Sequence, residues 1–248
     1  DYLGEVMVGA WEYEDYAKDF DGGLGWVSAG SGRIDLTGKP LGEALYTRVA
    51  LEKDNGPYIA VCPVNHTGDR HSPSAWKMTN AMPSWSWTGC EGQKASIEVY
   101  ARAARVELWL NGHIVGRKAL KNDCLAKFSV PYEPGRLEAA SYDAQGCELG
   151  RCTLTTAGQQ TQITAGPEQS SVQAGHLCYI RLRYTDEKGI TKPLARGNIK
   201  VEVDGGTLVG LGNACPYHER SYLDCVADTY YGEALAIVRA GEGNSLTL

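Results

Sequence analysis

Residues 96–118, SIEVYARAARVELWLNGHIVGRK, decide the fold of this 248-residue chain. Apolar and polar residues alternate in two runs, with Ile97, Val99 and Ala101 in the first and Val106, Leu108 and Leu110 in the second. A period of two indicates strands with one buried face. Asn111-Gly112 follows, and both residues accept the positive φ of a two-residue hairpin turn. We therefore expect a hairpin in which Trp109 lies opposite Ile114, on the face away from Leu108 and Leu110.

Short strand-like segments continue on both sides of this hairpin. From residue 85 to residue 155 there are about seven of them with frequent turns, the spacing typical of an immunoglobulin-like sandwich. A second set alternates at 179–184, 199–203 and 234–239, with a turn expected at 204–206 and a glycine-rich bend at 210–213. The sequence therefore predicts a mainly β chain with two immunoglobulin-like β-sandwich domains.

Residues 39–52 contain the one clear helical pattern. Apolar and long side chains recur there at helical spacing, and Pro40 suits the first turn. The Asn55-Gly56-Pro57 turn should end the helix, and a strand-like segment follows at 58–61. Residues 1–30 are irregular and rich in aromatic, acidic and glycine residues.

Composition limits the classes of partner. The chain is 43% hydrophobic and 22% charged, so a packed core is expected. The formal net charge of −6 argues against nucleic acid or an anionic membrane as the partner. No apolar run approaches the roughly 18 residues that span a bilayer, and no signal peptide opens the chain. Because it begins at Asp1 without an initiator methionine, we expect a piece of a longer protein.

The chain has eight cysteines, none in CxxC spacing. Free thiols, disulfides and a metal site remain alternatives at this point. We favour free thiols, because a chain of this size does not need covalent bridges. That preference leads us to expect a cytoplasmic protein.

Two groups of motifs resemble glycoside hydrolase family 2, the β-galactosidase-like enzymes. DYLGE, an acidic aromatic loop, Gly25-Trp26, and then GRIDLTGKP before a helix with Tyr46 are similar to the last strand, loop and helix of that family's TIM barrel. W-x-W, VYARAARVELWLNGHIVGRK, VPYEPGRLEAASYDAQG and TTAG resemble its first accessory sandwich. YTDEKGI, NIKVEVDGGTLVGLGNA and GEALAIVRA resemble its C-terminal bacterial-Ig-like domain.

The resemblance implies three parts. Residues 1–60 would be a short α/β remnant of the catalytic barrel, 61–157 the first sandwich and 158–248 the second. The longer protein would hydrolyse β-galactosides or similar β-glycosides by a retaining mechanism with two carboxylates. The family's catalytic glutamates lie on earlier barrel strands, so no catalytic residue is assigned here. The acids at Glu5, Glu12, Glu14, Asp15, Asp19 and Asp21 fit a solvated loop better than a catalytic pair.

The expected role is therefore structural. The remainder of its own chain, the barrel, would be the main partner of these accessory domains, with carbohydrate and a homo-oligomer as further candidate partners. Two alternatives remain open: a carbohydrate-binding module that uses exposed tryptophans, and a purely structural bacterial Ig-like array.

Trp76, Trp85 and Trp87 are the candidate substrate-binding residues, because exposed aromatic rings stack on the apolar faces of sugars. The alternative is that Trp85 and Trp87 pack at or beneath a domain junction, and Trp109 is interpreted in the same way. His66, Asp69 and His71 lie in a polar stretch, but no rigid element places a third ligand. We expect no metal and no cofactor.

Overall fold

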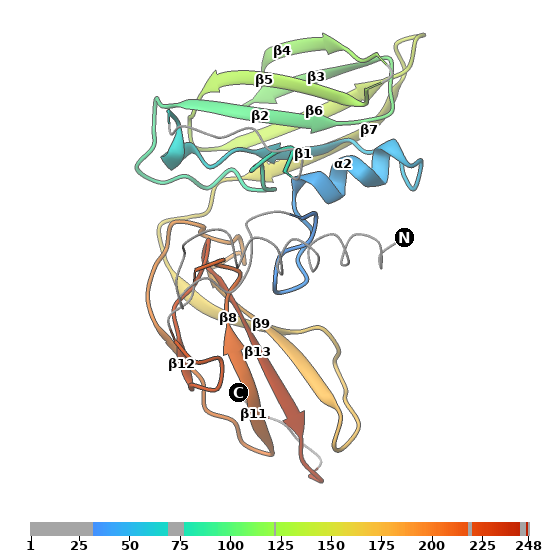
Figure 1. The fold of residues 1–248 in the computed structure, drawn as a ribbon. Coiled ribbons are helices and arrows are strands. Elements are labelled where there is room, and N and C mark those ends of the chain that lie inside the picture. Colours follow the sequence, from blue (N-terminus) through green and yellow to red (C-terminus); the bar gives the residue numbers. More distant parts are fainter. Residues whose placement is uncertain (1–31, 69–76, 122, 218–219, 244–246, 248) are drawn as a thin grey trace, which may run out of the picture. The chain divides into compact units, whose positions relative to one another are not determined.

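The computed structural model describes residues 32–68, 77–121, 123–217, 220–243 and 247 (Figure 1). Within these residues the chain divides into two compact units, which meet between Thr156 and Ala157. Unit 1 denotes residues 32–156 and unit 2 the residues from 157 onward. The chain is mainly β, with antiparallel sheets in both units. The described helices include none that is long and apolar enough to span a membrane.

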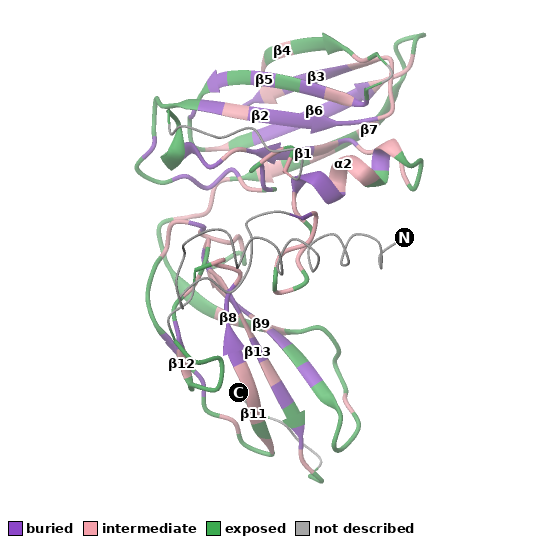
Figure 2. Cartoon of the chain, viewed as in Figure 1, coloured by how far each residue is buried: buried purple, intermediate pink, exposed green. Residues whose placement is uncertain are grey.

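Unit 1 contains two antiparallel sheets with the buried apolar residues between them (Figure 2). The first sheet has the order β1 (Tyr58–Val61), β2 (Lys94–Tyr100), β5 (Leu125–Pro131). The second has the order β4 (His113–Ala119), β3 (Arg105–Leu110), β6 (Arg136–Tyr142), β7 (Glu148–Thr155). Ile97 and Val99 on the first sheet and Leu108 and Leu137 on the second are fully buried.

The hairpin of β3 and β4 has the register that the sequence predicts. Trp109 pairs with Ile114, and Leu110 pairs with His113 across the turn. Asn111 and Gly112 both have positive φ, 50° and 84°, as a two-residue hairpin turn of this kind requires. The pairing shifts by one residue between Leu108 and Trp109, so a bulge lies just before the turn.

Helix α2 (Gly42–Ala50) lies against the outer face of the first sheet in unit 1. Val49 packs there with Ala60, Tyr100 and the partly buried Leu45. The period of two in β2 suggested one buried face, but Glu98 and Tyr100 on the second face are also buried, because α2 covers them. Beyond β1, a short 3-10 helix, η2 (Val64–His66), continues the chain.

Strand β1 belongs to the first sheet of unit 1. Tyr58 to Val61 pair with Tyr100 to Ile97 of β2, residue by residue. The domain boundary that the sequence predicts at residue 60 lies within this strand. Most of the proposed barrel remnant, residues 1–31, lies outside the described residues.

Unit 2 contains a four-stranded sheet and a two-stranded one. The larger has the order β11 (Gly206–Gly212), β13 (Glu233–Ala240), β9 (Leu177–Thr185), β8 (Gln162–Pro167), and the smaller pairs β10 (Ile199–Lys200) with β12 (Val226–Ala227). Ile180, Leu182, Ile199 and Val238 form part of its core.

Residues 210–212 were predicted as a bend but are part of strand β11. Gly210 pairs with Ile237, after a register shift that follows Leu208. Gly212 lies beneath the Tyr222 ring, where a Cβ would come within 2.4 Å of a ring carbon. The glycine therefore allows the Tyr222 ring to approach the strand closely, although a glycine-rich composition by itself indicates a turn.

Two charged side chains fix the segment that leads into β8. Lys192 Nζ donates to the carbonyl oxygens of residues 158, 159 and 160 and to Thr161 Oγ1, at 2.7 to 3.0 Å. Asp186 is buried and accepts from the amides of Gly158, Lys188 and Ile190. Burial alone would raise the pKa of Asp186, but these amides hold it below its ordinary value.

Candidate functional site

Trp85 and Trp87 lie in the core of unit 1. They are 1% and 0% exposed, and the Trp85 ring meets Tyr132 edge-on with 4.8 Å between centroids. Trp85 Nε1 donates to the Glu133 carbonyl oxygen at 3.0 Å, and Trp87 Nε1 to that of Ser84 at 3.3 Å. A ring with no exposed face cannot stack on a sugar, so their position fits the packing interpretation. Trp76 lies outside the described residues.

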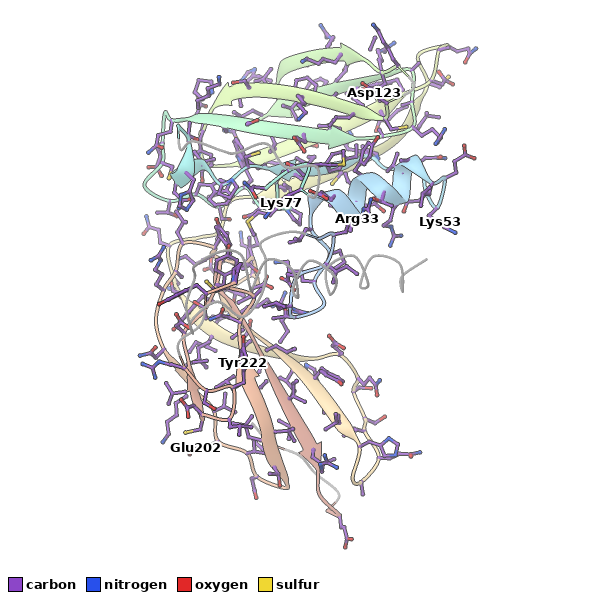
Figure 3. All side chains as sticks on the ribbon, in the orientation of Figure 1. Arg33, Lys53, Lys77, Asp123, Glu202 and Tyr222 are labelled. Carbon is purple, nitrogen blue, oxygen red and sulfur yellow. The ribbon has the colours of Figure 1, made fainter. Side chains whose placement is uncertain are left out.

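A small cleft between α2 and β2 holds two buried carboxylates. It is lined by Glu43, Tyr46, Met78, Thr79, Glu98, Tyr100, Leu125 and Lys127. Glu43 is 5% exposed and Glu98 is 4% exposed. Glu43 comes from the first turn of α2, and Glu98 from the face of β2 that α2 covers. Figure 3 shows the described side chains on the whole ribbon.

Both carboxylates are engaged by neighbouring groups. Glu43 Oε1 accepts from the backbone amides of Met78 and Thr79, the latter at 3.0 Å. Glu98 Oε2 accepts from the Tyr100 hydroxyl at 2.6 Å, and Glu98 Oε1 lies 3.0 Å from Lys127 Nζ. These contacts compensate the burial of two charges and join α2, β2 and β5.

Two ionisable groups in or near the cleft have a raised pKa. Burial, followed by the charge of Glu98 and its hydrogen bond, raises the pKa of Tyr100 well above its usual range. Burial and the same glutamate raise the pKa of the nearby Cys62 thiol. Both groups therefore stay protonated at neutral pH, and Cys62 lacks the thiolate that a nucleophile needs. The cleft has a volume of about 30 Å³, far below the roughly 300–1,000 Å³ of typical ligand pockets.

Trp109 lies on the outer face of the second sheet of unit 1, within a network of charged side chains. The Arg151 guanidinium lies 5.9 Å from its ring centroid, and that of Arg105 lies 4.5 Å from the Tyr142 centroid. Glu107 lies 3.0 Å from Arg117, and Glu138 lies 3.0 Å from Arg136. Sequence reasoning found the tryptophan but not these neighbours, because they come together only through the register of β3, β4, β6 and β7.

The described residues offer no arrangement for a metal or a disulfide. No group of three or more His, Cys, Asp or Glu residues is placed to hold an ion within the described ranges. His66 lies in η2, while Asp69 and His71 lie outside the described residues. All eight cysteines are free, and Cys90, Cys124 and Cys178 are buried.

Two family models and one curated protein match parts of this chain. Residues 92–150 match a model described as "Domain of unknown function (DUF4982)", and residues 162–248 match "Glycoside hydrolase family 2 C-terminal domain 5". A curated "Putative beta-glucuronidase" from Formosa agariphila is 33% identical over 90 residues, which are 35% of this chain and 9% of that protein.

Solved structures show the same relation. Two structures of a glycosyl hydrolase family 2 member from Bacteroides cellulosilyticus match with TM-scores of 0.76 and 0.79 at 29% and 30% identity. They cover 88% and 89% of this chain, and this chain covers 30% of theirs. A β-glycosidase from Bacteroides vulgatus shares the fold, with a TM-score of 0.71, 21% identity, and coverage of 90% of this chain and 27% of that one. These matches identify the chain as a C-terminal region of a glycoside hydrolase family 2 protein.

Proposed function

We propose that the two units are non-catalytic accessory domains of a retaining β-glycosidase, which support its catalytic barrel. The observation that carries this proposal is the state of the buried carboxylates. A retaining glycosidase holds two carboxyl groups about 5 Å apart on either side of a sugar ring. Here Glu43 and Glu98 are bound by amides, a tyrosine and a lysine around a space of about 30 Å³. A sugar ring does not fit there.

The outer carboxylates support the same conclusion. Glu107 and Glu138 on the second sheet of unit 1 each form an ion pair with an arginine at 3.0 Å. Asp186 in unit 2 is occupied by three backbone amides. Carboxylates held this way stabilise a sheet or a turn, and a structural role accounts for each of them.

The substrate of the longer protein is proposed as a β-glycoside. The sequence resemblance suggested β-galactosides. The curated relative is named as a putative β-glucuronidase, which favours β-glucuronides. Both substrates therefore belong in the first assay.

A direct assay tests the accessory role. The purified chain is incubated with nitrophenyl β-galactoside and nitrophenyl β-glucuronide, beside a mock preparation and the longer protein. We expect the chain to match the mock preparation and the longer protein to hydrolyse one substrate. Turnover by the chain above the mock level would contradict the proposal, and an inactive longer protein would contradict the assignment of its activity.

A further inference from the structure

The segment that connects the two units is bound at its first end to unit 1. Thr156 Oγ1 donates to the Trp85 carbonyl oxygen at 2.6 Å and accepts from the Gly135 amide at 3.0 Å. The Thr156 amide in turn donates to the Gly135 carbonyl oxygen at 2.9 Å. Because Trp85 is 1% exposed, these hydrogen bonds attach the last residue of unit 1 to the core of that unit.

The second end of the connection is bound to unit 2 by the ammonium group of Lys192. Its Nζ lies 2.7 to 3.0 Å from four oxygens, which are the carbonyl oxygens of residues 158, 159 and 160 and Thr161 Oγ1. An ammonium group has three protons, so these four oxygens share them. Hydrogen bonds from a charged donor are stronger than those between neutral groups. One side chain therefore orders four successive residues.

Lys192 is itself held against strand β9. Its amide donates to the Tyr184 carbonyl oxygen of that strand at 2.8 Å. Asp186 follows the end of β9 and binds the same segment, since its Oδ2 accepts from the Gly158 amide at 2.8 Å. The residues after Gly158 are thus attached to β9 through two side chains of opposite charge, one of which binds carbonyl oxygens and the other an amide.

We propose that Thr156, Asp186 and Lys192 form a clamp on the connection, which restricts the rotation of one unit against the other. The contacts of unit 1 end at Thr156 and those of unit 2 begin at Gly158, so at most Ala157 lies between them. One residue has two soft backbone dihedral angles, which makes a short joint instead of a flexible linker. The clamp is a property of this chain and does not depend on the activity of the longer protein.

Nuclear magnetic relaxation of the backbone amides tests the clamp on the whole chain, because it gives a rotational correlation time for each unit. We expect nearly equal correlation times in the unmodified chain. Lys192→Met keeps the apolar stem but removes the ammonium group, so each unit should then tumble faster and with its own correlation time. Hydrogen exchange at the Gly158 amide should also accelerate about tenfold or more. Lys188→Met removes the same charge from an exposed side chain and should change neither quantity.

Thr156→Val tests the other end of the clamp and should likewise separate the two correlation times. The proposal is overturned if the units of the unmodified chain tumble independently, if Lys192→Met leaves both correlation times unchanged, or if Lys188→Met has the same effect as Lys192→Met. Exchange in β13 shows whether unit 2 of the Lys192→Met variant remains folded. Should that unit unfold, Thr156→Val decides, and unchanged correlation times in this variant overturn the proposal.

Discussion

Asn111 connects two turns of unit 1 through a single amide. Its Nδ2 donates to the Pro134 carbonyl oxygen at 3.1 Å, and its Oδ1 accepts from the Arg136 amide at 2.8 Å. Asn111→Asp should therefore lower the free energy of unfolding of unit 1 by about 0.5–1.5 kcal/mol, because a carboxylate oxygen would face the Pro134 carbonyl oxygen without a proton between them. Urea unfolding near neutral pH measures this. Asn111→Gly keeps the positive φ and separates the backbone effect, and an Asp variant as stable as the original would refute the prediction.

Tyr100 should make unit 1 sensitive to alkali. Its pKa in the folded state lies above the unfolded value of about 10, because burial and Glu98 oppose its ionisation. A raised pKa means that the folded state holds the proton more tightly. The resulting stability is fully present below the unfolded pKa and is lost as the pH rises above it.

Unfolding followed by tryptophan fluorescence from about pH 8 to about pH 11 checks this dependence. Trp85, Trp87 and Trp109 all lie in unit 1 and report its transition. Tyr100→Phe should lower stability at neutral pH, since Glu98 loses a donor, but it should flatten the decline above about pH 10. A decline of unchanged steepness in this variant would mean that other groups cause it.

At the scale of elements, the first residue of α2 makes an unusually close contact. Gly42 donates its amide to the Ala81 carbonyl oxygen at 3.1 Å, and a Cβ on Gly42 would come within 2.5 Å of that oxygen. Gly→Ala in a helix normally stabilises it by about 0.5–1 kcal/mol. In Gly42→Ala the clash with the Ala81 carbonyl oxygen should instead lower the stability and move α2 away from the loop at Ala81.

The sign of the Gly42→Ala effect is measured by thermal unfolding, with hydrogen exchange at residues 42–50 as the local readout. The substitution Gly166→Ala is the control, because the nearest atom to the added Cβ would be 3.7 Å away. If Gly42→Ala proves as stable as the unmodified chain, the close contact between α2 and Ala81 is absent in solution.

The strands and the turn could be predicted from local periodicity. Which faces of these strands another element covers could not be predicted in this way. Asn111-Gly112 and the alternation around it determined the register of β3 and β4, because turn type and strand period are local properties. Glu98 alternates with apolar residues, a pattern that by itself indicates an exposed side chain, but α2 comes from a distant part of the chain to cover it. Trp85 and Trp87 illustrate the same limit, since a spacing of two does not indicate whether a ring meets solvent or Tyr132.

At the scale of the whole molecule, each unit has a core of its own. A destabilising core substitution should therefore affect only the unit that contains it. Leu182 is 2% exposed in the core of unit 2, and Val99 is fully buried in unit 1. Leu182→Ala should cost unit 2 about 2–5 kcal/mol, since it leaves a cavity among packed side chains. Hydrogen exchange should then accelerate in β9 and β13 and remain unchanged in β2 and β3. Val99→Ala should instead accelerate exchange in β2 and β3 and leave β9 and β13 unchanged, with a smaller loss of stability. If either substitution accelerates exchange equally in all four strands, the two units unfold as one cooperative body, and an accessory role for either unit could not be tested separately.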